Sequence, residues 1–188
     1  MGTVEKIDID IFKVVNRAIA ESDDLEIMAN QITQLLVGTL GIKGCTVFAL
    51  NPATDELEPL ASFGLSIGYL NKGPILTARS IAGTKRGKPV VIKDISASKL
   101  LQYPEEARKE GVAAILSVPI RFAGRVIGAL RLYHHDVWEI SGSDLDSFLV
   151  LGENIGLAMT YSRLVNALRE VKRTASEVHD IWLNPSGR

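Results

Sequence analysis

The chain has 188 residues, of which 46% are hydrophobic and 23% charged, and its formal net charge is −1. This composition is typical of a globular protein with one sizeable core, and a nearly neutral chain has no overall field to attract nucleic acid or an anionic membrane surface. Cys45 is the only cysteine, which excludes an intrachain disulfide. The sequence has no apolar run near the roughly 18 residues of a membrane span and no basic signal-peptide start. It therefore predicts a cytoplasmic protein without nucleic-acid or membrane partners.

The N-terminal part of the chain is predicted to form two helices. In the first, apolar residues recur at steps of three and four, at Val4, Ile7, Ile11, Val14 and Ala18. A polar interruption follows at residues 22–24, where Asp23 with Glu26 is expected to cap the second helix. That helix carries a second apolar face and is expected to end near Gly41.

The middle of the chain is predicted to form strands. Residues 45–50 and 57–63 are short apolar runs separated by turn-forming residues, and residues 90–93 form a third, briefer run. Because proline cannot donate to a ladder, Pro59 is expected to place the second strand at a sheet edge. Residues 64–77 are interpreted as a loop, and residues 78–86 as a short helix.

Residues 111–133 are the most regular apolar segment of the sequence. A short helix over 104–110 begins at Pro104 and is followed by two apolar runs, 113–120 and 126–133, around a short polar link that contains a glycine. The order of elements therefore predicts an α+β fold with a central antiparallel β-sheet of five or six strands. A hairpin that is apolar on both faces needs cover on both sides.

The last helix is predicted to begin at the capping box of Ser141 and Asp144 and to run to about Leu183, a length of roughly 60 Å. Its apolar residues alternate at steps of four and three, which keeps one seam facing a partner. We therefore expect a homodimer in which the terminal helices form a four-helix bundle, the alternative being that both apolar stripes pack only on their own sheet. The expected interface consists of Ile7, Ile11, Val14, Leu164, Leu168, Val171, Val178 and Trp182.

The sequence resembles the GAF sensory domains from about Asp23 to Leu164. The resemblance depends on the order and spacing of SIAG at 80–83, GKPVVIKD at 87–94, GV at 111–112, SVPI at 117–120, GRVIGAL at 124–130 and SDL at 143–145. It implies terminal helices on one face of the sheet and, on the other face, loops and short helices that form a pocket. It divides the chain into an N-terminal dimerisation helix over 1–22, a GAF-like domain over 23–160 and a C-terminal signalling helix and tail over 161–188.

What such a pocket would bind is left open by the sequence, and so is any cofactor. The family's methionine sulfoxide reductases need paired cysteines, and this chain has only Cys45. Its bilin-binding members need a cysteine near the pocket, where this sequence has none. The signature of its cyclic-nucleotide-binding members is missing apart from Asn71-Lys72. The pocket wall is expected to come from Phe63, Leu65, Tyr69, Ile81, Asp94, Tyr103, Ser117 and Arg131. Tyr69 and Tyr103 could stack on a ligand while Arg131 meets an anionic group; alternatively, the tyrosines anchor loops and Arg131 is solvated.

Two histidine-containing segments are candidates for metal binding or phosphotransfer. His134-His135-Asp136 suggests metal or haem, but adjacent histidines on a strand point to opposite faces, so a solvated or hydrogen-bonded turn is the interpretation and no metal site is predicted. The segment around His179 faintly resembles a histidine-kinase phosphoacceptor box, with one residue too many before Pro185. No catalytic residues are assigned.

The resulting hypothesis is a non-catalytic sensory domain that binds a small molecule and passes the signal through a homodimer to a downstream effector. The alternative is a dimerisation or protein-interaction module with a vestigial, filled pocket, which could be the sensor fragment of a histidine kinase or another signalling protein. An enzyme that uses the pocket is the third candidate.

Overall fold

The computed structural model describes residues 9–22, 24–76, 84 and 86–183, with side chains on the last helix described to residue 175. The expected roles of Val4, Ile7, Asp23 and Ile81, the side chains of Val178 and Trp182, and most of the helix predicted over 78–86 lie outside the described residues. The elements are α1 (Ile9–Glu21), α2 (Leu25–Leu40), β1 (Gly44–Asn51), β2 (Glu56–Phe63), α3 (Ile67–Leu70), β3 (Ile75–Leu76), β4 (Val90–Ile92), α6 (Pro104–Glu110), β5 (Ala114–Phe122), β6 (Arg125–His134) and α7 (Gly142–Leu183).

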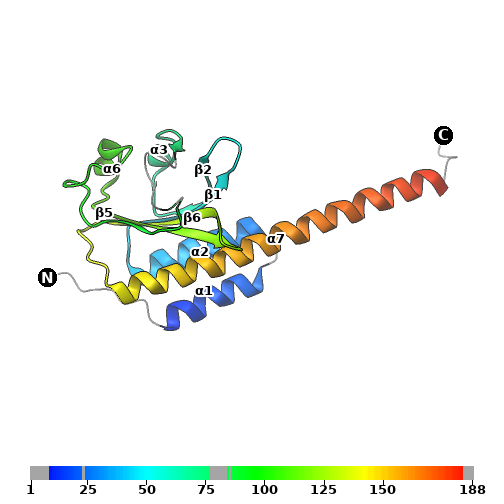
Figure 1. Ribbon diagram of the computed structural model, residues 1–188, viewed down its shortest axis with the longest axis horizontal. Helices are drawn as coiled ribbons and strands as arrows, with labels where there is room; N and C mark the ends of the chain where they lie inside the picture. Colours follow the sequence, from blue (N-terminus) through cyan, green and yellow to red (C-terminus); the bar gives the residue numbers. More distant parts are fainter. Residues whose placement is uncertain (1–8, 23, 77–83, 85, 184–188) are drawn as a thin grey trace.

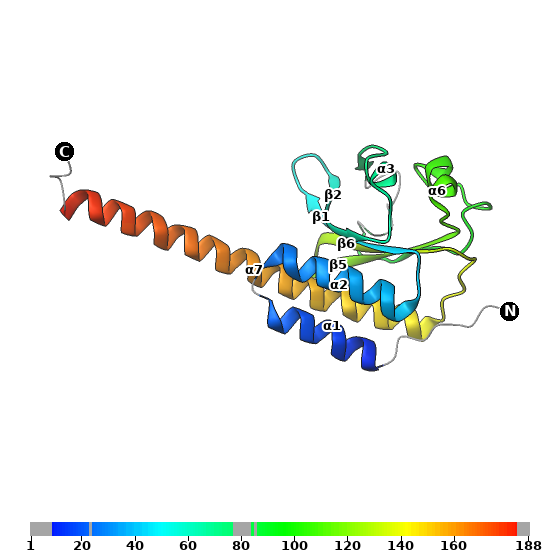
Figure 2. The same ribbon diagram turned by 180° about the vertical axis from the view of Figure 1, so that it is seen from behind.

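The strands form one six-stranded antiparallel sheet in the order β3-β2-β1-β6-β5-β4. Helices α2 and α7 cover one face of this sheet, with α1 packed beneath them on the same side, while α3, α6 and their connecting segments lie on the other face (Figures 1 and 2). The predicted α+β fold with terminal helices on one face is therefore confirmed.

The β5–β6 hairpin is the centre of the fold. Its strands are joined by a two-residue turn in which Ala123 and Gly124 have φ of 48° and 75°, the backbone shape that matches the twist of a hairpin. Side chains alternate across it, so that Leu116 and Leu130 join the core under the helices while Ile115 belongs to a second cluster on the opposite face. The expectation that this hairpin is covered on both faces is confirmed.

The position of Pro59 differs from the expectation. β2 is not an edge strand, because β3 pairs with Glu56 and Leu57 on its outer side. The register with β1 shifts between Val47 and Phe48, so that Pro59 lies beside a β-bulge and beyond the end of β3. Proline has no amide to donate, so within sheets it is found at bulges and where a strand has no neighbour on one side. Pro59 lies beside a bulge and past the two residues that pair with β3, which explains why it is tolerated.

The segment expected to be a loop over 64–77 contains α3 and β3. Ser66 caps α3 by accepting a hydrogen bond from the Tyr69 amide, and its own amide and hydroxyl donate to Glu110 of α6. The short helix is thus held by a residue 44 positions away in the sequence, which local patterns could not reveal.

The cap of α2 also differs by one position from the expectation. Asp24, not Asp23, directly precedes the helix, and its carboxylate accepts hydrogen bonds from the amides of Glu26 and Ile27 at 2.9 and 3.0 Å. The helix ends at Gly41 as predicted, with φ of 63°.

Helix α7 packs closely on β5 and then leaves the body of the protein. Ser141 accepts the amide of Asp144 at 3.0 Å, which confirms the predicted cap. Gly152 and Gly156 face the sheet, where added Cβ atoms would lie 2.6 Å from the Pro119 carbonyl oxygen and 2.1 Å from that of Arg121. The C-terminal half of the helix projects from the domain (Figures 1 and 2).

Helix α1 turns most of its apolar face toward its own protein. Ile11 is only 4% exposed and lies with Val15 in the core on the helical side of the protein, while Val14 is at the surface. The expectation that Ile11 belongs to a seam between two copies is therefore corrected, because α2 and α7 already cover it. Within the described ranges, no helix has the length and apolarity needed to cross a membrane.

Candidate functional site

A small cavity lies on the face of the sheet opposite the long helices. It is bounded by β3, β4, β5, β6, the end of α3 and the loop before α6. Its polar lining consists of Tyr69, Lys72, Gln102, Tyr103, Ser117 and Arg131, and the remainder is Ile, Val and Leu. The space open to the centre of a water molecule is about 20 Å³, which is room for one ordered water.

The structure brings together four of the residues expected to form a pocket wall. Tyr69, Tyr103, Ser117 and Arg131 line this cavity. Phe63, Leu65 and Asp94, which were also expected in the wall, do not line it.

Phe63 is 44% exposed at the end of β2, and Leu65 packs against the cluster around Tyr69. The Asp94 carboxylate accepts hydrogen bonds from the amide and hydroxyl of Ser96, which hold the pKa of that carboxyl below its ordinary value. Asp94 therefore shapes a turn and is not part of the cavity lining.

Arg131 lies in the middle of β6 and is only 4% exposed. In the sheet register it stands between Thr46 of β1 and Ser117 of β5, and its guanidinium carbon is 5.5 Å from the centre of the Phe48 ring. The alternative of a solvated Arg131 is thereby excluded. A buried guanidinium is always charged, so the cavity has a permanent positive charge in its wall.

Lys72 is a second cation in the lining, and it was not among the residues expected to form the pocket wall. Its Nζ donates to the Tyr69 carbonyl oxygen at 2.9 Å and lies 3.7 Å from the centre of the Tyr69 ring. Burial, followed by the charge of Arg131, lowers the pKa of Lys72 to about 8. The Tyr69 ring in turn meets Tyr133 edge-on, with ring centres 5.8 Å apart.

Gln102 and Tyr103 join two walls of the cavity. The Tyr103 hydroxyl and the Gln102 side-chain amide both donate to the Pro74 carbonyl oxygen at 3.0 Å, and the Leu76 amide donates to the Gln102 side-chain oxygen at 3.2 Å. These bonds connect the loop before α6 to β3 and hold the cavity in its present narrow form.

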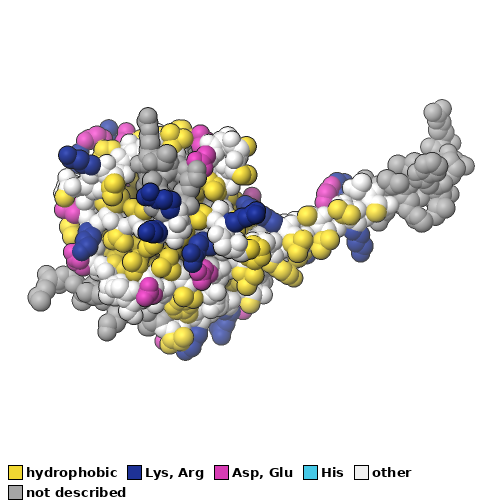
Figure 3. Space-filling model, in the orientation of Figure 1, with side chains coloured by type: hydrophobic (Ala, Val, Ile, Leu, Met, Phe, Trp, Pro, Cys, Tyr) yellow, Lys and Arg dark blue, Asp and Glu magenta, His cyan; other side chains and the backbone are white. Residues whose placement is uncertain are grey.

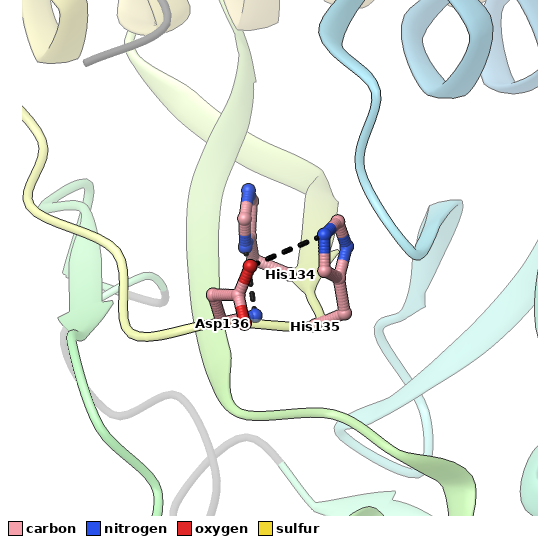
Figure 4. A group of neighbouring side chains, drawn as sticks. All are labelled: His134, His135 and Asp136. Carbon is pink, nitrogen blue, oxygen red and sulfur yellow. Dashed lines mark hydrogen bonds and ion pairs between the residues drawn. The ribbon is translucent and has the colours of Figure 1, made fainter. Parts of the chain in front are cut away.

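The His134-His135-Asp136 cluster is a hydrogen-bonded turn, as expected, but the rings are arranged differently (Figure 4). Strand β6 ends at His134, so the alternation of side chains stops, and the two imidazoles stack with centres 4.6 Å apart and planes 18° apart. Nδ1 of His134 accepts the Asp136 amide at 2.9 Å, and Nε2 of His135 lies 3.3 Å from the Asp136 carboxylate. One ligand atom from each of the three residues lies within 4.8 Å of the other two, so the cluster could also hold a metal ion, and the absence of a metal site stays a prediction.

A second feature is a line of exposed apolar side chains on α7, here called the α7 stripe. It consists of Leu157, Tyr161, Leu164, Leu168 and Val171, which are between 58% and 66% exposed. Hydrophobic side chains gather on the projecting helix where it leaves the domain (Figure 3). Leu157 and Tyr161 also border a groove of about 600 Å³ between α7 and the end of α1.

The comparisons with known proteins agree with this architecture. The family model described as GAF domain matches residues 24–159. No curated protein matches the chain in sequence.

Solved structures share the fold at low sequence identity. The GAF domain of a phosphoenolpyruvate-protein phosphotransferase from Coxiella burnetii has a TM-score of 0.72 at 16% identity, covering 85% of this chain and 98% of that one. The free methionine-R-sulfoxide reductase from Neisseria meningitidis, solved with its substrate, has a TM-score of 0.69 at 17% identity, covering 82% and 91%. The GAF domain of cyanobacteriochrome TePixJ has a TM-score of 0.65 at 16% identity, covering 78% and 95%.

Proposed function

This chain belongs to the GAF family of sensory and regulatory domains of signalling proteins, and from that membership we propose that it binds a small molecule and transmits the signal through the helices of a homodimer. The ligand would occupy the cavity between β3, β4, β5 and β6, and a downstream effector would respond to the terminal helices. A cytoplasmic location is part of the proposal, and the single cysteine of the chain supports it.

The observation that carries the proposal is that one sheet layer separates the cavity from α7. Ser117 and Arg131 line the cavity, whereas their chain neighbours Val118 and Leu130 lie in the core under the helices. Any displacement of β5 or β6 by a ligand would therefore reach the packing of α7 directly. Because α7 continues without interruption into the α7 stripe, the same displacement would reach a partner copy.

The α7 stripe supports a dimer on energetic grounds. Fully burying one such side chain contributes about 1.5–3 kcal/mol, so the stripes of two copies would gain about 10 kcal/mol or more. Association costs about 4–15 kcal/mol in lost freedom of motion, so the expected dimer is stable but depends on concentration. The groove beside Leu157 and Tyr161 would extend the same contact toward α1.

Sedimentation velocity over a range of protein concentrations tests the dimer. We expect the wild type to be dimeric and Leu168→Glu to be monomeric, because two carboxylates would be buried in the seam. Asn166→Glu places the same charge on the exposed far side of α7 and should leave the dimer intact. A monomeric wild type, or equal dissociation of the two variants, would contradict the proposal.

The narrowness of the cavity favours a second candidate function, a dimerisation or protein-interaction module with a filled pocket. Room for one water is too little for a metabolite unless a wall moves. Native mass spectrometry of gently purified protein separates the two candidates. A stoichiometric bound molecule supports sensing, and a dimer that stays empty with a metabolite screen that gives no thermal shift supports the module.

We propose no catalytic role for the pocket. The Neisseria protein shares the fold and is a methionine sulfoxide reductase, but a thiol-disulfide cycle needs a second thiol. Cys45 has no such partner in the chain, and it is fully buried on the helix-facing side of the sheet, where burial raises the pKa of its thiol.

A further inference from the structure

The cavity has a pronounced charge imbalance. Arg131 and Lys72 both line it, and among the described lining residues there is no carboxylate. Two cationic side chains in one lining give the cavity a positive potential that favours an anionic guest, whatever other contacts each side chain makes within the protein. The two cations approach the cavity from different elements, Arg131 from β6 and Lys72 from the segment after α3.

The rest of the lining indicates the kind of molecule that would accompany an anionic group. Aliphatic side chains from β3, β4 and β5, among them Ile75, Val90 and Ile115, form most of the wall, and the Tyr69 ring continues it. Such a surface suits a compact apolar body better than a polyhydroxylated or multiply charged one. The Ser117 hydroxyl accepts from Thr84 at 3.3 Å and keeps its own proton to donate to a ligand, whereas the Tyr103 hydroxyl is engaged with Gln102 and Pro74 while the cavity is narrow.

We propose that the cavity binds a small organic acid, with its carboxylate between Arg131 and Lys72 and its apolar body against the aliphatic wall. This inference depends on the proposed sensory function and names its ligand class. The planar fork of a guanidinium matches a carboxylate, and an ammonium can neutralise the same group from another side.

The charges around Lys72 make the binding sensitive to pH. Arg131 faces it from β6, whereas Glu106 and Glu110 of α6 act in the opposite direction, and burial with Arg131 outweighs them to set the pKa of Lys72 at about 8. A bound carboxylate favours the protonated ammonium. Above pH 8 the free protein has lost that proton, so affinity for the acid should fall as pH rises.

Binding also requires the cavity to widen. The hydrogen bonds from Gln102 and Tyr103 to the Pro74 carbonyl lie at exposed positions, where water can replace them. This wall is therefore expected to yield before the β5–β6 hairpin, whose two faces are both covered.

The test uses matched acid and amide pairs on the full chain: propionate with propionamide, benzoate with benzamide, and phenylacetate with phenylacetamide, plus inorganic phosphate. Thermal shift ranks them and calorimetry measures affinity. We expect at least one acid to bind and its amide to bind at least tenfold more weakly. Arg131→Met and Lys72→Met should each weaken the acid, while Lys99→Met, at an exposed position outside the cavity, should not.

Between pH 6.5 and 9.5 the affinity for the best acid should fall by about tenfold, and Lys72→Met should remove this dependence. Arg131 is buried, so Arg131→Met could fail to fold. In that case the Lys72→Met result alone decides the question. Equal binding of acids and amides, binding of phosphate alone, or no binding by any acid overturns the inference. A neutral molecule that copurifies would also overturn it while leaving the sensory function standing, whereas an empty, monomeric protein would end both.

Discussion

The close approach of α7 to β5 can be tested by adding one methyl group. In Gly156→Ala the new Cβ would lie 2.1 Å from the Arg121 carbonyl oxygen, about 1 Å inside the closest contacts that such atoms make. The oxygen belongs to the backbone of a central hairpin and cannot rotate away. The helix must therefore move off the sheet, together with the buried side chains of Phe148, Leu151 and Ile155.

Two opposing contributions set the magnitude of the effect. Alanine is favoured over glycine within a helix by about 1 kcal/mol. Overpacking of a core costs about 1–3 kcal/mol, and here it loosens several buried contacts of α7 at once. We expect Gly156→Ala to lower the free energy of unfolding by about 2 kcal/mol, or the Tm by roughly 4–8 °C for a chain of this size.

Gly38 offers a matched control with the opposite expected sign. It also lies within a helix, at an exposed position of α2, and a Cβ there would meet nothing within 4 Å. Gly38→Ala should therefore raise the free energy of unfolding by up to about 1 kcal/mol. Urea denaturation followed by circular dichroism, at one protein concentration, measures both variants. If Gly156→Ala is as stable as Gly38→Ala, the packing of α7 described here is wrong.

Three further predictions follow from the caps, the buried thiol and the cavity. Asp24→Ala removes the acceptor for two amides at the start of α2 and should cost about 1 kcal/mol in urea denaturation, whereas Asp24→Asn should retain most of it. Native Cys45 should resist a thiol-specific chromogenic reagent that reacts at once in denaturant; rapid labelling of the folded protein would contradict its burial. Because the pKa of Lys72 lies near 8 when folded and 10.5 is its ordinary value, its proton is held more tightly in the unfolded chain, and Lys72 alone should add about 1–2 kcal/mol to the free energy of unfolding from pH 8 to 10.5. Burial raises the pKa of Cys45, Tyr69 and Tyr133, which lowers stability over the same range in wild type and in Lys72→Met alike, so the measurement is the difference between the two proteins. Wild type and Lys72→Met with the same pH dependence would show that Lys72 is not desolvated.

The elements that sequence patterns predicted well are those stabilised by neighbours in the chain. Residues 104–110 carry their own start and stop signals in Pro104 and Gly111, and the helix has these bounds. The β5–β6 hairpin has two long apolar runs and a glycine turn, and α7 has a cap at Ser141. Each of these signals lies within or beside the element that it defines, so it can be recognised in the sequence without knowledge of the fold.

What the sequence could not show depends on contacts between distant segments. Helix α3 is held by Glu110, which no pattern in residues 64–77 indicates. Spacing revealed an apolar face on α1 but not what covers it, and Ile11 is covered by its own protein. Lys72 is adjacent to Arg131 only because α3 lies over the sheet, so the second cation of the cavity could not be found from spacing alone.

The pair of glycines on α7 limits how the helix can respond to events in the sheet. Turning the helix about its own axis would bring Glu153 or Leu157 to the positions where Gly152 and Gly156 now meet backbone carbonyls, and neither side chain would fit there. Axial rotation is thereby blocked near the domain, and tilting about these two contacts remains. A tilt of a rigid rod displaces its far end more than its near end, so small changes at β5 would be amplified along the projecting half.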